Sequence, residues 1–263
     1  MDDKKYLIEK IQKRIVKKIA LNLAGTNLCL IGGYRLRLLD NSPRISMDLD
    51  YHSSEDLEKK RDEVITLLEN KLLPEIHKDF GYEGTVAPAR GPDKDSALLK
   101  TIDLAFFIKD FAYSRIEICI DIITMRVLDK PVSRTTDGVV YLTVSDQDII
   151  EGKVIALLDS LYVRDRDIID IFLFEDKFAD DSANRIAAKL TTLSLDRSTI
   201  AKRIQTLYDA RDVHINSIEA IIDNQLDSSA AENIKRGGGA SAIFDHVMVI
   251  LKQKLKLVLD NQS

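Results

Sequence analysis

Two glycines and two aspartates in the first fifty residues have the types and spacing of a nucleotide-binding site. Gly32 and Gly33 follow a short apolar run that indicates a buried strand. Asp48 lies sixteen residues after Gly32, and Asp50 follows it in a segment where apolar and polar residues alternate. This alternation predicts a strand over 45–51 from which both carboxylates project on the same side.

These residue types can bind a divalent cation and a phosphate chain. Two carboxylates whose Cα atoms lie roughly 6.5–7 Å apart can share one hard cation, and Mg²⁺ favours one or two carboxylates together with phosphate oxygens. Glycines without a Cβ let the backbone approach a triphosphate and turn its N–H groups toward the anion. Exposed strands often carry aspartates, so a plain polar face is the competing interpretation; the preceding Gly-Gly turn favours the metal.

A third carboxylate could come from a strand predicted over 114–124. Glu117 and Asp121 lie on one face of this strand, opposite a row of isoleucines. If the strand lies beside the aspartate pair, Glu117 or Asp121 could reach the same metal. Otherwise both residues face solvent on an amphipathic strand.

A second polar cluster lies further along the chain. Glu151 is too close to Lys153 on the same predicted helix to pair well with it, which leaves the lysine available. Asp167 and Asp170 are three residues apart and share one face of the next helix. A structural network of ion pairs is the competing interpretation.

Composition and missing motifs restrict the function classes. The 263 residues are 45% hydrophobic and 31% charged with net charge −5, which is typical of a soluble globular protein. The two cysteines form no CxxC pair, and no apolar run approaches the ~20 residues of a membrane helix. The sequence contains no P-loop, no GxGxxG and no HExxH. We therefore expect a cytoplasmic protein without membrane association.

The predicted elements change character near residue 145. Before it, helices alternate with strands: a basic amphipathic helix over the first twenty-odd residues, a long helix over 53–78 bent near Pro74, a loop over 84–97 and a hairpin of two strands. After it, only helices are predicted. The expected architecture is α/β (α+β), with a mixed-sheet domain over 1–145 and a helical domain over 146–263. The helices are expected over 146–162, 165–176, 182–193, 198–208, 211–226 and 240–259.

The two clusters together resemble the AbiEii-type nucleotidyltransferases, toxin components of abortive-infection toxin–antitoxin systems within the DNA-polymerase-β-like superfamily. The family's first block reads Gly-Gly-Thr-Ala-Leu and then Arg-x-Ser-x-Asp-Leu-Asp. Here it reads Gly32-Gly33-Tyr34-Arg35-Leu36 and then Arg44-Ile45-Ser46-Met47-Asp48-Leu49-Asp50. The last block resembles Glu151-Gly152-Lys153 followed by Arg166-Asp167-Ile168-Ile169-Asp170. The resemblance spans about residues 25–175.

The resemblance implies a nucleotidyltransferase fold and a Mg²⁺-dependent transfer of a nucleotide from an NTP to an acceptor hydroxyl. Lys153 would contact the nucleotide phosphates, and Asp167, with Asp170, would act near the acceptor or as the base. The nucleotide-binding set is Gly32, Gly33, Arg35, Arg37, Arg44, Ser46 and Lys153. The catalytic set is Asp48, Asp50, Lys153, Asp167 and Asp170, and the metal set is Asp48, Asp50 and Glu117.

Tyr34 departs from the family pattern, which has a small Thr or Ser whose hydroxyl touches phosphate. Arg35 or Arg37 could compensate as a phosphate contact. Two other interpretations stay open: a small-molecule nucleotidyltransferase, and a non-catalytic binding protein with a degenerate fold. The acceptor could be a tRNA or a protein, with the basic first helix favouring RNA, and the family implies a cognate antitoxin as partner.

Overall fold

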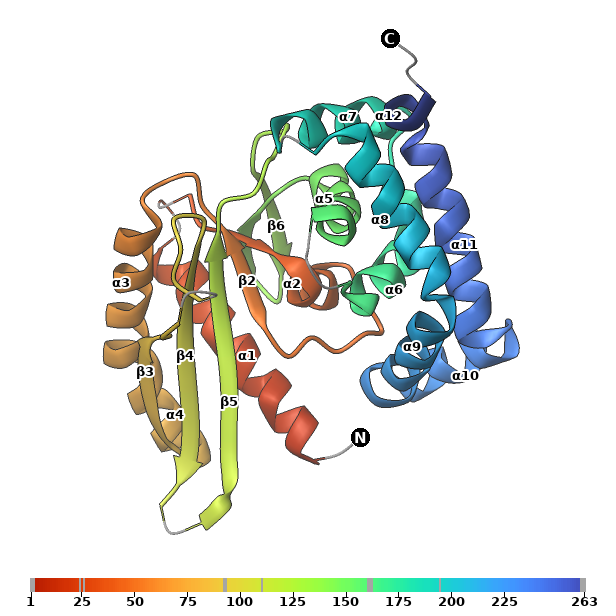
Figure 1. Ribbon diagram of the computed structural model, residues 1–263. Helices are drawn as coiled ribbons and strands as arrows, with labels where there is room; N and C mark the ends of the chain where they lie inside the picture. The colour runs from red at the N-terminus through yellow and green to blue at the C-terminus, as the bar shows by residue number, and fades with distance from the viewer. Residues whose placement is uncertain are drawn as a thin grey trace. The chain divides into compact units, whose positions relative to one another are not determined.

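The computed structural model describes residues 3–23, 25, 27–91, 94–109, 111–159, 163–193 and 195–260. The chain forms two compact units (Figure 1). The sheet unit comprises Met1–Asn41, Ser46–Met125 and Pro131–Val144, and the helical unit comprises Ser42–Ile45, Arg126–Lys130 and Ser145–Ser263. The boundary predicted after residue 145 lies one residue past the main division, and the prediction does not include the two short segments that belong to the helical unit.

A seven-stranded mixed sheet forms the centre of the sheet unit, in the order β3-β4-β5-β2-β1-β7-β6. Strand β2 pairs antiparallel with β1 and parallel with β5, and β1 pairs parallel with β7. This topology confirms the expected α/β class with a mixed sheet. The strands are β1 (Cys29–Ile31), β2 (Leu49–His52), β3 (Glu83–Pro88), β4 (Leu99–Ile108), β5 (Phe111–Ile123), β6 (Val132–Thr136) and β7 (Val139–Thr143).

The strands at the two edges and the start of β2 differ from the sequence prediction. The loop predicted over 84–97 is wrong at its start, because Glu83–Pro88 pairs with β4 as the edge strand β3. Its proline is tolerated at an edge, where one row of N–H groups needs no ladder partner. Strand β6, at the other edge, has no counterpart in the prediction. Strand β2 begins only at Leu49, so Asp48 lies in a bend just before it.

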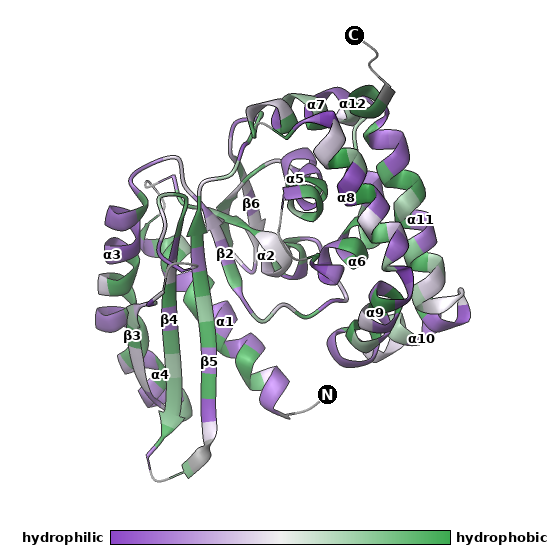
Figure 2. Cartoon of the chain, viewed as in Figure 1, coloured by the Kyte–Doolittle hydropathy of each residue, from purple (hydrophilic) through white to green (hydrophobic). Residues whose placement is uncertain are grey.

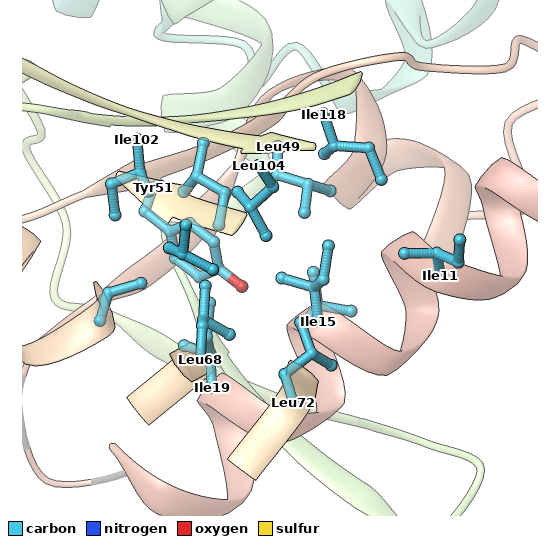
Figure 3. Close-up of a cluster of buried hydrophobic side chains, with 14 of the residues drawn as sticks. Ile11, Ile15, Ile19, Leu49, Tyr51, Leu68, Leu72, Ile102, Leu104 and Ile118 are labelled. Carbon is cyan, nitrogen blue, oxygen red and sulfur yellow. The ribbon is translucent and has the colours of Figure 1, made fainter. Parts of the chain in front are cut away.

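The core of the sheet unit lies between one face of the sheet and its helices. Helix α1 (Asp3–Asn22) buries Ile11, Ile15 and Ile19, which face Leu49 and Tyr51 of β2 (Figure 3). Because Leu49 and Tyr51 point into this core, the side chain of the residue between them points to the opposite face of the sheet. That residue is the metal-ligand candidate Asp50. In Figure 2 the long strands β4 and β5 are mostly green, whereas α3 carries many purple residues.

The helix predicted over 53–78, with a bend or break near Pro74, is divided by a π-helical turn that ends two residues before this proline. Helix α3 (Leu57–Leu67) begins at an N-cap aspartate, Asp56, whose carboxylate accepts the N–H groups of Glu58 and Lys59 at 2.9 and 3.0 Å. A π-helical turn over Leu68–Leu72 leads into α4 (Leu73–Phe80), where Pro74 occupies the first turn and its missing N–H costs no hydrogen bond. Helix α2 spans Gly32–Leu39.

The helical unit confirms the six helical segments predicted after residue 145, except that residues 160–162 of the first segment lie outside the described residues. It also adds detail at its end. The segment predicted over 240–259 forms two helices, and a further helix, α10, precedes it. Within the described ranges, no helix combines the length and the apolar character needed to cross a membrane. The helices are α5 (Asp146–Asp159), α6 (Asp165–Leu173), α7 (Ser182–Thr192), α8 (Arg197–Asp209), α9 (Arg211–Gln225), α10 (Ser228–Arg236), α11 (Gly239–Lys254) and α12 (Lys256–Asp260).

Candidate active site

The turn from β1 into α2 lies directly against the carboxylate of Asp50. Gly32 has φ +72°, a conformation that residues with a side chain rarely adopt. A Cβ placed on Gly32 would lie 2.7 Å from Asp50 Cγ and closer still to its Oδ2. The register explains this proximity, since Ile31, the residue before Gly32, pairs with Asp50 across the β1–β2 ladder. The sequence predicts that the glycines allow a close approach of the backbone. In the structure, the group that lies close to the backbone of Gly32 is the carboxylate of Asp50.

The same turn forms the N-terminus of α2. The N-cap residue Ile31 provides no side-chain hydrogen bond to the first turn, which begins with Gly32 and Gly33. The first N–H groups of a helix have no partners within the helix, and its dipole places partial positive charge there. The carboxylate of Asp50 lies beside this end of α2. The helix terminus can therefore bind an anion such as a phosphate chain, together with a cation held by the carboxylate.

Tyr34, the residue that departs from the family pattern, points into the core. Its side chain is only 2% exposed and belongs to the same hydrophobic cluster as Leu30 and Tyr51. Burial raises the pKa of its phenol well above the usual value, and the nearby Glu9 raises it further. The ring therefore does not lie in the path that the turn leaves to an anion.

Asp48 is held by contacts to the backbone around it. Gln12 of α1 donates from Nε2 to the carbonyl oxygens of Ser46 and Met47, both at 2.9 Å. The buried Ser46 donates from Oγ to the carbonyl oxygen of Asp48 at 3.2 Å. Ser46 thus shapes the bend before β2, which differs from the nucleotide contact expected of it. Asp48 and Asp50 are both partly exposed.

The third carboxylate beside the pair is Asp121. The parallel β2–β5 register places Asp50 opposite Asp121, whose Oδ1 accepts a hydrogen bond from Thr101 Oγ1 at 2.6 Å. Glu117 lies four residues earlier on β5, roughly 13 Å along the strand. Its carboxylate is 67% exposed and pairs with Arg115 at 2.7 Å. Of the two candidates from the sequence, the register favours Asp121, and we do not retain Glu117 as a metal ligand.

The carboxylates of the sheet unit suit a metal that a substrate helps to hold. Over the residues with described positions, no group of three or more His, Cys, Asp or Glu side chains is arranged to hold a metal ion. Mg²⁺ commonly binds one or two carboxylates and completes its shell with water and phosphate oxygens. Asp48 and Asp50 supply hard oxygen donors of this kind, beside a backbone turn that can take a phosphate. These residues therefore fit Mg²⁺ bound together with a nucleotide.

The two arginines expected to contact phosphate are engaged in structural ion pairs. The fully buried Arg35 pairs with Asp40 and donates from Nε to Thr143 Oγ1 at 3.3 Å. Arg37 donates from Nε to Glu9 Oε1 at 2.7 Å. Both side chains tie α2 to neighbouring elements of the sheet unit, so we do not retain them as phosphate contacts.

In the helical unit, four charged side chains form one buried network. Arg44 donates through Nε and a terminal nitrogen to both carboxylate oxygens of Asp170, each at 2.7 Å. Lys153 of α5 contacts Asp167 Oδ1 at 2.7 Å and Asp170 Oδ2 at 2.9 Å. The structure thus brings together Lys153, Asp167 and Asp170 of the second block, and adds Arg44 from the first. Arg44 is expected from its sequence motif to contact a nucleotide, whereas in the structure its side chain forms an ion pair with Asp170.

The network determines the protonation of its members. Burial alone would favour neutral Lys153, but Asp167 and Asp170 outweigh it and raise its pKa. Burial likewise opposes ionised Asp170, and Lys153 and Arg44 outweigh it and lower its pKa. Both oxygens of Asp170 are occupied by these cations. In contrast, Asp167 Oδ2 is buried and accepts no hydrogen bond, which leaves one unsatisfied acceptor in the network.

A second buried ionic cluster in the helical unit was missed by the sequence reasoning. Lys189 contacts Asp148 at 2.7 Å and Glu151 at 2.8 Å, and all three side chains are almost fully buried. Arg185 donates to Glu151 at 2.7 Å and to both oxygens of Asp129 at 3.1 and 2.9 Å. The available signal was paired spacing, with carboxylates three residues apart on α5 and cations four residues apart on α7.

Comparison with known proteins gives one family. The family described as "Nucleotidyl transferase AbiEii toxin, Type IV TA system" matches residues 14–237. No curated protein matches the sequence.

Several solved structures share the fold at low sequence identity. The "putative nucleotidyltransferase from H. pylori" aligns with a TM-score of 0.58 and 17% identity over 98% of both chains. JHP933 from Helicobacter pylori aligns with a TM-score of 0.52 and 18% identity, over 98% of this chain and 95% of that one. MenT4, a nucleotidyltransferase toxin from Mycobacterium tuberculosis H37Rv, aligns with a TM-score of 0.51 and 14% identity, over 97% and 93%.

Proposed function

We propose that this chain, which belongs to the AbiEii nucleotidyltransferase toxin family, transfers a nucleoside monophosphate from an NTP to an acceptor hydroxyl. One observation carries the proposal. The backbone of Gly32, at the uncapped start of α2, lies so close to Asp50 that no side chain fits between them. Backbone N–H groups that can bind phosphate therefore lie next to a carboxylate that can bind a metal, and this arrangement supports nucleotide transfer.

Each part of the sheet-unit site has a proposed task. The first-turn N–H groups of α2 bind the triphosphate, and Asp48 and Asp50 hold Mg²⁺. Asp121, which lies beside Asp50, is a further candidate ligand of the metal. When bound, Mg²⁺ would neutralise negative charge on the phosphates. Ser46 and Gln12 fix the backbone at Asp48, so that its carboxylate needs little rearrangement when the nucleotide binds.

From the family pattern, we propose that the charged network of the helical unit also takes part in the transfer. Lys153 stays protonated through its two aspartates and offsets charge that develops on the leaving pyrophosphate. Asp167 takes the proton of the acceptor hydroxyl, as the family pattern implies. The acceptor oxygen bonds to the α-phosphorus while the bond to the bridging oxygen of the β-phosphate breaks, and pyrophosphate leaves. Asp170 has both oxygens occupied and keeps Lys153 and Arg44 in place.

The position of Tyr34 supports an active enzyme over a degenerate binding protein. Its ring lies in the core, so the turn after β1 keeps its N–H groups available to a phosphate. The two aspartates and the lysine that the family pattern requires are also present.

For the acceptor, the surface of α1 favours a polyanion over a small molecule. Lys10, Lys13, Arg14 and Lys17 line one groove, together with Asp79 and Phe80. Lys13 also pairs with Asp137, and Arg14 pairs with Glu75 and Asp79, so Lys10 and Lys17 carry most of this argument. Cations that recur with every helical turn suit a phosphate backbone, so we propose RNA, including tRNA, as the first acceptor to test. A protein acceptor and a small-molecule acceptor are the other outcomes. We further propose that a cognate antitoxin opposes the activity in the cell.

The decisive experiment is a labelling reaction. The chain is incubated with each of the four NTPs, labelled at the α-phosphate, with Mg²⁺ and with total tRNA, a protein lysate or small hydroxylated acceptors. We expect one acceptor class to become labelled, and Asp48→Asn and Asp50→Asn to abolish the labelling. Glu117→Gln serves as the matched control, because its exposed carboxylate lies on the same strand as Asp121. Absence of label in every acceptor, with NTP binding also absent, would overturn the proposal.

A further inference from the structure

Two short segments of the N-terminal half belong to the helical unit, although the chain on both sides of each belongs to the sheet unit. They are Ser42–Ile45 and Arg126–Lys130, which we call the first and second strap. The first strap ends three residues before Asp48. The second begins three residues after Ile123, the last residue of the strand that carries Asp121. Each strap therefore lies next in sequence to a strand with candidate metal ligands.

The first strap is anchored by both side chain and backbone. Arg44 holds both oxygens of Asp170 at 2.7 Å, and the two side chains are 3% and 0% exposed. Arg44 also forms an isolated β-bridge with Leu226, just after α9. Beside this bridge, the N–H of Ile45 donates to the carbonyl of Gln225 at 2.7 Å, and the N–H of Asp227 donates to that of Pro43 at 2.9 Å.

The second strap has an anchor of the opposite polarity. Here the strap supplies the carboxylate, Asp129, and α7 supplies the cation, Arg185, again in a two-bond contact at 3.1 and 2.9 Å. Asp148 of α5 accepts the N–H groups of Leu128 and Asp129, both at 3.0 Å. Ser145 donates from Oγ to Asp129 Oδ2 at 2.6 Å.

Such anchors suit the fixing of geometry. A two-bond arginine–carboxylate pair constrains the direction as well as the distance between its partners, whereas burying the charges offsets much of the stability gained. The three-residue step from Ile45 to Asp48 spans at most roughly 10 Å. If the anchor at Arg44 were released, the chain before β2 would keep the contacts from Gln12 to Ser46 and Met47 but lose its anchor to the helical unit.

We propose that Asp170 and Arg185 are positioning residues: through the two straps they fix the chain as it enters β2 and as it leaves β5, and so hold the carboxylates of Asp48, Asp50 and Asp121. The metal-binding part of this inference rests on the proposed function; the anchoring of the two strands does not. It also gives the C-terminal region a task, since Gln225, Leu226 and Asp227 supply the backbone side of the first anchor.

The test is backbone hydrogen exchange on the chain alone, without metal or nucleotide. In Asp170→Asn we expect amides of 46–52 to exchange at least tenfold faster, with the β3–β4 pair unchanged. In Arg185→Met we expect the same for amides near the end of β5, with 46–52 unchanged. Arg211→Met is the matched control, because Arg211 makes a comparable two-bond contact with Asp245, at 3.0 and 2.7 Å, elsewhere in the helical unit.

A purely structural role for these pairs would speed exchange throughout the chain. Uniform acceleration, or no change at 46–52 and at the end of β5, would therefore overturn the proposal. Should Asp170→Asn fail to fold, Arg44→Lys decides the first arm, since it keeps the charge and removes the two-bond geometry. Fast local exchange in the variants of a chain that labels no acceptor would retain the anchoring and reject the proposed function. Full labelling of an acceptor, with unchanged hydrogen exchange in the variants, would retain the proposed function and reject the anchoring.

Discussion

Gly32 and Asp50 occupy adjoining space: the position that a side chain would take on Gly32 is filled by the carboxylate of Asp50. The pairing of Ile31 with Asp50 in the β1–β2 ladder fixes this relationship, and the positive φ of Gly32 turns the backbone into α2. The start of a helix and a carboxylate thereby come together through one hydrogen-bonded ladder. Both the phosphate-binding and the metal-binding proposals depend on this contact.

Gly32→Ala should therefore be more damaging than an ordinary glycine substitution. The left-handed conformation alone costs roughly 1–2 kcal/mol for a residue with a Cβ, and the clash with Asp50 adds to it. Gly138 is the control: its φ is +70° and a Cβ there meets nothing within 4 Å. We expect Gly138→Ala to show only the conformational cost in urea denaturation and to keep NTP binding. Gly32→Ala should lose more stability and its NTP-induced thermal shift; equal behaviour of the two variants would contradict this.

Asp121 and Glu117 can be separated by the same kind of matched comparison. Because Asp121 lies opposite Asp50 in the register, Asp121→Asn should weaken Mg²⁺-dependent NTP binding at least tenfold, about 1.4 kcal/mol. Glu117→Gln should leave it within twofold, since Glu117 is exposed and distant along β5. Calorimetry with Mg²⁺ and NTP measures both. A larger effect for Glu117→Gln would restore the sequence-level assignment.

The local parts of this site could be predicted from the sequence. A buried run ending in Gly32-Gly33, and the alternation around Asp48 and Asp50, are signals within a few residues, and they located the turn and the aspartate pair. The choice between Glu117 and Asp121 depended on the pairing of β5 with β2, whose register no spacing encodes. Both residues fit the amphipathic pattern equally well.

The partners of the charged residues could not be predicted for the same reason. Arg35 donates a hydrogen bond to Thr143, and Arg37 donates one to Glu9. Arg44 donates to Asp170, which is 126 residues away in the chain. Each looks in sequence like a cation available to a phosphate. The edge strands β3 and β6 were missed because an edge strand needs only one partner, and β3 also contains a glycine and a proline.

Tyr34 gives a prediction that reverses the one suggested by the family pattern. From the sequence, Tyr34→Thr should restore a phosphate contact and keep or improve NTP affinity. In the structure the ring is buried in the core, so Tyr34→Thr should cost about 3–5 kcal/mol of folding free energy, as for removal of other buried aromatic rings. Tyr34→Phe keeps the ring and should change stability by less than about 1.5 kcal/mol. Urea denaturation tests both; a stable Tyr34→Thr with improved NTP affinity would contradict the buried position.

The Arg44–Asp170–Lys153 network should make the chain sensitive to acid. Lys153 and Arg44 hold the pKa of Asp170 below its usual 3.8 against the effect of burial, so the unfolded chain takes up this proton at a higher pH than the folded chain. The stabilisation is then fully present above pH 3.8 and is lost as the pH falls from there through the folded-state pKa. Asp170→Asn should lower the free energy of unfolding at pH 7 and flatten its decline in acid. Urea midpoints measured from pH 7 to pH 3 for both proteins, with Asp245→Asn as an exposed-pair control, give the two slopes. Parallel slopes for the native chain and Asp170→Asn would show that Asp170 is not ionised in the folded state, and would remove the anchor proposed for the first strap.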